Sequence, residues 1–173
     1  ADNPPSDCAQ GHFCPEGTEF TTQYPCAAGT FSAATNLIAQ SGCTACPAGQ
    51  HCVGGGSTPS GLCAAGHWCS LETTHATQHP CPAGTYTAAT DLVRAEDCDP
   101  CTTGHFCEEG AAAPAPCSAG SYQDDTESSH PSCKVCPAGS FCTAASVTPT
   151  ECGAGYFSAA GAFECSQCPA GYY

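Results

Sequence analysis

The sequence predicts small disulfide-rich tandem repeats that form an elongated rod of short β-ribbons and turns, with little helix and no conventional hydrophobic core. Two observations predict this fold. The chain has 173 residues with 19 cysteines but only 16 Leu, Ile, Val and Phe residues, and one short cysteine pattern recurs ten times. So few large apolar side chains cannot bury enough surface to offset backbone ordering. Disulfides that restrict the unfolded chain would replace that core.

The recurring pattern is a cysteine, two residues, a glycine, one residue, and then an aromatic residue or histidine. A glycine at a fixed place indicates a turn that needs positive φ or a close backbone approach. The predicted organisation is an N-terminal extension, residues 1–7, and an array over 8–173 whose repeats span 8–25, 26–45, 46–62, 63–80, 81–100, 101–116, 117–135, 136–151, 152–167 and 168–173, the last incomplete.

The aromatic position carries the largest apolar group of each repeat, so we expect it to pack on its own disulfide or on the neighbouring repeat. An exposed aromatic row that binds a ligand is the alternative. The expected packing residues are Phe13, Phe31, Trp68, Tyr86, Phe106, Tyr122, Phe141 and Phe157.

Each of the first nine repeats contains one further cysteine, so each has an opening and a closing cysteine. Pairing inside each repeat is favoured, although sequence cannot fix connectivity and an interleaved pairing across adjacent repeats remains open. Cys168 has no partner, from which we expect the chain to continue past Tyr173 or Cys168 to pair elsewhere. The expected disulfide cysteines are Cys8, Cys14, Cys26, Cys43, Cys46, Cys52, Cys63, Cys69, Cys81, Cys98, Cys101, Cys107, Cys117, Cys133, Cys136, Cys142, Cys152 and Cys165.

Secondary structure should be sparse. We expect short two-stranded ribbons around the aromatic positions and turns at the Pro-Ala-Gly sites. One helical turn is predicted near Asp91 to Ala95.

Composition also bounds location and partners. Disulfides at this density persist only in an oxidising compartment, which predicts an extracellular or cell-surface protein. The sequence contains no long apolar stretch, so no direct membrane insertion is expected in this segment. A formal charge of −14 with only Arg94 and Lys134 as basic residues argues against nucleic acid as a partner.

No residue pattern indicates catalysis, a cofactor or a metal. The Cys-x-x-Cys pairs could supply half of a zinc site, but they lie at repeat junctions and are expected to form disulfides. The histidines His12, His67 and His105 recur just before an aromatic, which favours packing or a hydrogen bond to the turn. Acidic groups at 96–99 and 124–127 lack the spacing of a calcium loop and are interpreted as solvated faces.

Serines and threonines near proline are candidates for O-linked glycosylation, because they fall in exposed polar loops. The residues are Ser57, Thr58, Thr148 and Thr150.

Two features resemble a known family. The openings Cys81-Pro82-Ala83-Gly84-Thr85-Tyr86 and Cys136-Pro137-Ala138-Gly139-Ser140-Phe141, together with the cysteine pairs at 43/46, 98/101, 133/136 and 165/168, resemble ephrin-receptor-like cysteine-rich repeats. Those repeats are relatives of the tumour-necrosis-factor-receptor modules. The resemblance implies an elongated stack of small modules in receptor ectodomains, adhesive proteins, or surface and flagellar-hair proteins.

So little positive charge, together with the uniform, alanine-rich, low-complexity filling of the repeats, favours a structural role over ligand recognition. We therefore expect an extracellular structural protein and not an enzyme, as a subunit of a filament, flagellar hair or surface coat. Its partners would be further copies of itself or other extracellular structural proteins. The alternative is a receptor ectodomain or adhesin that binds a protein or glycan ligand.

Overall fold

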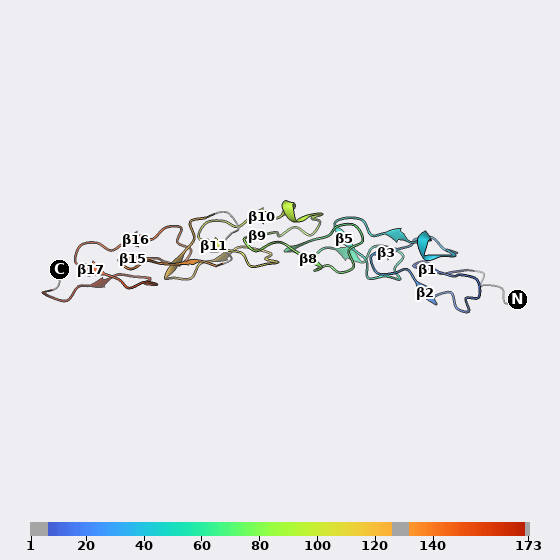
Figure 1. Ribbon diagram of the computed structural model, residues 1–173, viewed down its shortest axis with the longest axis horizontal. Helices are drawn as coiled ribbons and strands as arrows, with labels where there is room; N and C mark the ends of the chain where they lie inside the picture. Colours follow the sequence, from blue (N-terminus) through green and yellow to red (C-terminus); the bar gives the residue numbers. More distant parts are fainter. Residues whose placement is uncertain (1–6, 126–131, 172–173) are drawn as a thin grey trace. The chain divides into compact units, whose positions relative to one another are not determined.

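The computed structural model describes residues 7–125 and 132–171. The chain divides into two compact units, Ala1–Pro80 with Ala89–Asp97 and Cys81–Ala88 with Cys98–Tyr173. Each unit consists of small disulfide-bonded repeats with paired strands, and Figure 1 shows their order along the chain. This agrees with the predicted class of small disulfide-rich tandem repeats.

Each of the first nine repeats contains one two-stranded antiparallel ribbon with two residues in each strand. In the first unit, β1 (His12–Phe13) pairs with β2 (Tyr24–Pro25), β3 (Thr30–Phe31) with β4 (Thr44–Ala45), β5 (Gln50–His51) with β6 (Gly61–Leu62), and β7 (His67–Trp68) with β8 (His79–Pro80).

The same ribbon recurs through the second unit. There, β9 (Thr85–Tyr86) pairs with β10 (Asp99–Pro100), β11 (His105–Phe106) with β12 (Ala115–Pro116), β13 (Ser121–Tyr122) with β14 (Lys134–Val135), β15 (Ser140–Phe141) with β16 (Thr150–Glu151), and β17 (Tyr156–Phe157) with β18 (Ser166–Gln167).

The cysteine pattern determines where each ribbon begins. In the first repeat, the amide of His12 donates to the carbonyl of Ala9 at 3.2 Å, and Gly11 lies between them with φ of 76°. A turn with positive φ at its third residue favours glycine. The first strand leaves this turn, and the ribbon ends at the next opening cysteine, where Cys26 N donates to the Gly11 carbonyl at 2.8 Å.

Helix is limited to two 3-10 turns in the described residues, η1 (Gln40–Gly42) and η2 (Ala95–Asp97). Each one immediately precedes the closing cysteine of a long repeat, Cys43 or Cys98. The helical turn predicted near Asp91 to Ala95 is present but displaced, since η2 shares only Ala95 with that range. The backbone of this segment is used elsewhere, because the carbonyl of Leu92 accepts a hydrogen bond from Cys69.

The interior of the repeats consists of sulfur instead of large apolar side chains. The buried apolar residues of the described chain are all cysteines, and the largest fully buried side chains are those of Thr73 and Thr87. Nine disulfides run within single repeats: Cys8–Cys14, Cys26–Cys43, Cys46–Cys52, Cys63–Cys69, Cys81–Cys98, Cys101–Cys107, Cys117–Cys133, Cys136–Cys142 and Cys152–Cys165. Cys168 has a free thiol.

Candidate functional site: the junctions between repeats

Adjacent repeats are joined mainly through their backbones. At the first junction, Gly11 N donates to the carbonyl of Ser32 at 2.8 Å. Asn36 N donates back to the carbonyl of Cys8 at 3.1 Å, and Cys14 N donates to the carbonyl of Leu37 at 2.7 Å. These three hydrogen bonds, here called the junction bonds, connect repeat 1 to repeat 2.

All three junction bonds recur at the same positions in five further repeats, and repeats 4 and 6 show one of them each, Cys69 to Leu92 and Gly104 to Gln123. Each bond is written here from the donating amide to the accepting carbonyl. In the first unit the bonds between repeats 2 and 3 are Gly29 to Cys52, Gly55 to Cys26 and Ser32 to Gly56. Those between repeats 3 and 4 are Gly49 to Cys69, Glu72 to Cys46 and Cys52 to Thr73. In the second unit they are Gly84 to Cys107, Gly110 to Cys81 and Thr87 to Ala111, then Gly120 to Cys142, Ala145 to Cys117 and Gln123 to Ser146, then Gly139 to Ser158, Gly161 to Cys136 and Cys142 to Ala162.

The second junction bond depends on a residue in the left-handed backbone region. The residues that donate to an opening-cysteine carbonyl all have φ between 59° and 78°. This conformation is costly for residues with a Cβ atom, and the junction holds three such residues in it. These left-handed residues are Asn36, Gly55, Glu72, Gly110, Ala145 and Gly161.

Five of the turn glycines, Gly11, Gly29, Gly49, Gly104 and Gly120, also meet the repeat two places further along. A Cβ atom on Gly29 would lie 2.5 Å from the carbonyl oxygen of Glu72, and one on Gly120 would lie 2.3 Å from that of Gly161. Real Cβ atoms do not approach so closely. The fixed glycine is therefore required by its positive φ and also by this close approach.

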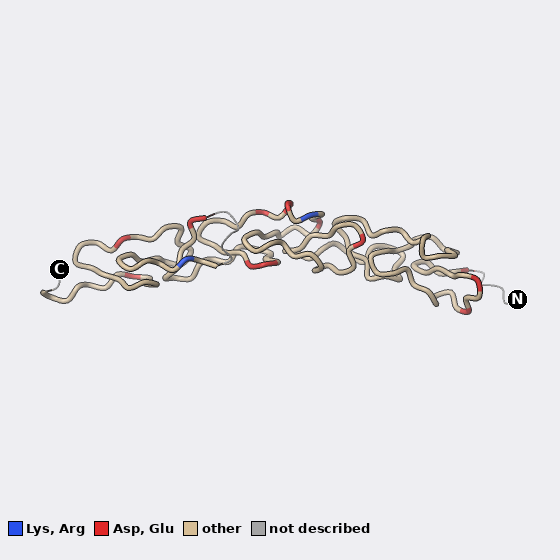
Figure 2. The backbone as a smooth tube through the Cα atoms, viewed as in Figure 1, with Lys and Arg blue, Asp and Glu red and all other residues tan. Residues whose placement is uncertain are grey.

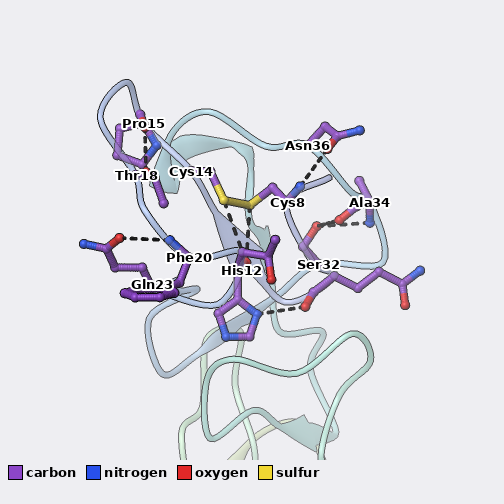
Figure 3. Close-up of a disulfide and its surroundings, with 12 residues drawn as sticks. Cys8, His12, Cys14, Pro15, Thr18, Phe20, Gln23, Ser32, Ala34 and Asn36 are labelled. Atoms are coloured by element: carbon purple, nitrogen blue, oxygen red, sulfur yellow. Dashed lines mark hydrogen bonds between the residues drawn. A yellow bond between two sulfur atoms is a disulfide. The ribbon is translucent and has the colours of Figure 1, made fainter. Parts of the chain in front are cut away.

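Side chains support the first junction, which Figure 3 shows around the Cys8–Cys14 disulfide. The Asn36 side chain accepts a hydrogen bond through Oδ1 from the amide of Cys8 at 2.8 Å. The hydroxyl of Ser32 accepts from the amide of Ala34 at 3.1 Å and so holds the turn that leads to Asn36. Asn tolerates the left-handed region better than other residues that carry a Cβ atom, which suits it to this place.

The predicted packing aromatics lie at the first strand of each ribbon, where they are half-buried in repeats 1 to 8. Two of them stack on the residue directly across their own ribbon: Phe13 on Tyr24 at 5.6 Å between ring centroids, and Trp68 on His79 at 4.5 Å. Phe157 in repeat 9 is 50 % exposed. The remaining residues of this set are Phe31, Tyr86, Phe106, Tyr122 and Phe141.

The recurring histidines bond to the turn that precedes them. Nδ1 lies 2.9 Å from the Gln10 carbonyl in His12, 3.1 Å from that of Ala65 in His67, and 3.0 Å from that of Thr103 in His105. This confirms the predicted turn role for the three histidines.

Charged groups are spread along both units, as Figure 2 shows. Arg94 pairs with Asp97 at 3.2 Å inside the first unit. In the second unit, hydrogen bonds to Asp124 and then Asp125 raise the pKa of the Lys134 ammonium group above its ordinary value. Two of the acidic residues at 124–127, Asp124 and Asp125, therefore form ion pairs with Lys134. Glu127 lies outside the described residues.

The glycosylation candidates lie in loops and on one strand. Thr58 and Thr148 are exposed, Ser57 is half-buried, and Thr150 is an exposed residue of β16. Glycosylation of these residues stays a prediction.

Two cavities lie beside ribbon aromatics in the second unit. One, of about 320 Å³, is lined by Phe106, Glu108, Glu109, Gly110, Ala111, Ala113 and Ala115. The other, of about 400 Å³, is lined by residues 157–164 and by Ser166. Among residues 7–125 and 132–171, no cluster of three or more His, Cys, Asp or Glu side chains could hold a metal, and no helix is long and apolar enough to cross a bilayer.

The left-handed residues were not identified from the sequence. In short repeats they lie three places after the closing cysteine, and a glycine occupies that place as Gly17, Gly55 and Gly110. Glu72 and Ala145 interrupt the series. The glycines at this place could have predicted some of the left-handed residues from the sequence, but not Glu72 or Ala145.

A scan against protein-family models matches none, and a search of the curated proteins finds no significant relative.

Proposed function

We propose that this chain is a structural segment of an extracellular protein, in which repeats stack as an elongated array within a filament, flagellar hair or surface coat. The observation that carries the proposal is the set of junction bonds. These bonds join backbone to backbone, so one junction geometry serves repeats whose side chains differ.

A backbone-mediated junction suits a mechanical role. Each repeat contacts the next repeat and the one after it, and arrays built from such local contacts are extended in proportion to the number of repeats. The disulfide inside each repeat prevents its loop from lengthening under load, and the junction bonds resist separation of one repeat from the next. The high disulfide content supports an oxidising, extracellular setting.

The repeats are proposed to be of the ephrin-receptor-like type, related to tumour-necrosis-factor-receptor modules. Support comes from the recurring Cys-Pro-Ala-Gly openings and the Cys-x-x-Cys pairs between repeats. O-linked sugar on Thr58 and Thr148 would fit the exposed position of both side chains.

Small-angle X-ray scattering of the unreduced chain tests the elongated array. A compact globule of this length has a radius of gyration of about 16 Å, whereas a rod of about 100 Å would approach about 30 Å. A value near the compact limit would overturn the extended array.

Electron microscopy of the native, unreduced material tests the structural role. Regular filaments with a repeating subunit would support it. Dispersed single molecules that bind a cell surface or glycan would replace it with the receptor or adhesin alternative.

A further inference from the structure

Repeat 6 contains a cavity whose lining includes one aromatic and two acidic residues. It is lined by Phe106, by Glu108, Glu109 and Gly110, and by the alanines Ala111, Ala113 and Ala115. Both glutamates are exposed. The cavity holds about 320 Å³, which is ample for one long side chain.

The cavity is open because the residue across the ribbon is small. Phe106 lies opposite Ala115 in the register of β11 and β12. At the same place in repeats 1 and 4, Tyr24 and His79 stack on the ribbon aromatic and cover it. The cavity of repeat 9 follows the same rule, since Phe157 lies opposite Ser166.

Repeat 5 holds the wall of this cavity in place. Gly110 N donates to the carbonyl of Cys81 at 2.9 Å, and the carbonyl of Ala111 accepts from Thr87 N at 3.1 Å. A turn bond from Ala111 N to the Glu108 carbonyl at 3.1 Å fixes the segment that carries both glutamates. The backbone of the segment that carries the two glutamates is therefore held in place against repeat 5.

We propose that this cavity binds an arginine side chain from a basic segment of a partner protein. A planar guanidinium stacks on an aromatic face and pairs with carboxylates through its forked donors. No basic residue lines the cavity. The net charge of −14 favours a basic partner over a second copy of this acidic chain. The inference is independent of the filament proposal.

The first test is an NMR titration of the unreduced, 15N-labelled chain with an acetylated tetra-arginine amide at 150 mM salt. Amide shifts should concentrate at 106–115, with Gly110 and Ala115 among the largest. Shifts spread evenly over the acidic residues of both units would overturn the proposal, because they would indicate diffuse charge attraction.

Variants separate the cavity from the general charge of the protein. Glu108→Gln with Glu109→Gln should weaken binding by about fivefold. The matched double variant Glu16→Gln with Glu19→Gln removes the same charge from exposed positions in repeat 1 and should weaken it by less than about twofold. Equal losses in the two double variants would contradict a site in repeat 6.

Two further substitutions leave the charge unchanged. Phe106→Leu keeps an apolar wall without the ring and should weaken binding by about threefold. Ala115→Tyr should cover Phe106 as Tyr24 covers Phe13, and should weaken binding by about fivefold or more while the ribbon stays folded. Unchanged affinity in Ala115→Tyr, with amide shifts that show an intact fold, would overturn the proposal.

Discussion

Repeats 7 and 9 share the same opening pattern but differ in burial. In repeat 7, Cys117 is fully buried, Gly120 is buried, and the ribbon aromatic Tyr122 is half-buried. In repeat 9, Cys152 is only half-buried and Phe157 is 50 % exposed. Since the local turn and ribbon are the same in both, the difference comes from what packs on them.

Repeat 8 shows that hydrogen bonds from the next repeat and cover over the turn glycine come from different repeats. Gly139 makes its junction bond to the Ser158 carbonyl in the next repeat at 3.1 Å. Gly139 nevertheless remains exposed, and a Cβ atom there would meet nothing within 4 Å. The following repeat therefore supplies hydrogen bonds, and the repeat after that supplies the cover over the turn glycine.

The disulfide interior of each repeat is thus covered largely by the next two repeats. This arrangement explains how a chain with so few large apolar side chains folds, because backbone groups and disulfides provide the contacts. Stability of a repeat should then depend on whether two further repeats follow it, more than on its own sequence.

The largest effect should come from removing a disulfide inside the array. Loop entropy alone assigns about 2.4 kcal/mol to Cys46–Cys52 and about 3 kcal/mol to Cys152–Cys165, because the second loop is longer. Cys46 and Cys52 are both buried, whereas Cys152 and Cys165 are only half-buried. We therefore expect the double serine variant at 46 and 52 to lose more stability, about 4 kcal/mol, in thermal unfolding followed by circular dichroism.

The matched control is the double serine variant at 152 and 165, which should lose about 2 to 3 kcal/mol. A larger loss at 152 and 165 than at 46 and 52 would mean that loop length, and not cover by later repeats, sets the stability.

The second effect concerns the turn glycines. Gly120→Ala places a Cβ atom 2.3 Å from the Gly161 carbonyl oxygen, whereas Gly139→Ala meets nothing within 4 Å. Both residues have similar positive φ, 88° and 81°. The strain of about 1 to 2 kcal/mol from the left-handed region is therefore common to both variants.

Gly120→Ala should cost about 2 kcal/mol more than Gly139→Ala, because the backbone of repeat 9 must move away. Native-state hydrogen exchange at the amides of Cys136 and Gly161 measures the loss locally. Equal exchange in the two variants would show that positive φ alone requires the glycine.

The sequence predicted those features of the structure that only one or a few residue types can form. The fixed glycines and aromatics predicted the turns and ribbons, because positive φ and a half-buried strand restrict residue choice. The junction bonds were not predicted, since their donors and acceptors are backbone groups that any residue carries. The two 3-10 turns precede closing cysteines without a shared sequence, which explains the misplaced helical turn.

The smallest effect concerns the left-handed residues with a Cβ atom. Ala145 has φ of 59°, and its amide donates to the Cys117 carbonyl at 2.8 Å. Glycine adopts this conformation without the penalty, so Ala145→Gly should stabilise the second unit by about 0.5 to 1 kcal/mol.

The exposed neighbour Ala144 provides the control, because it has no positive φ and Ala144→Gly should be slightly destabilising. Hydrogen exchange at Ala145 in the first case, and thermal unfolding in both, measures the difference. If both glycine variants were destabilised alike, the junction would not hold Ala145 in a strained conformation.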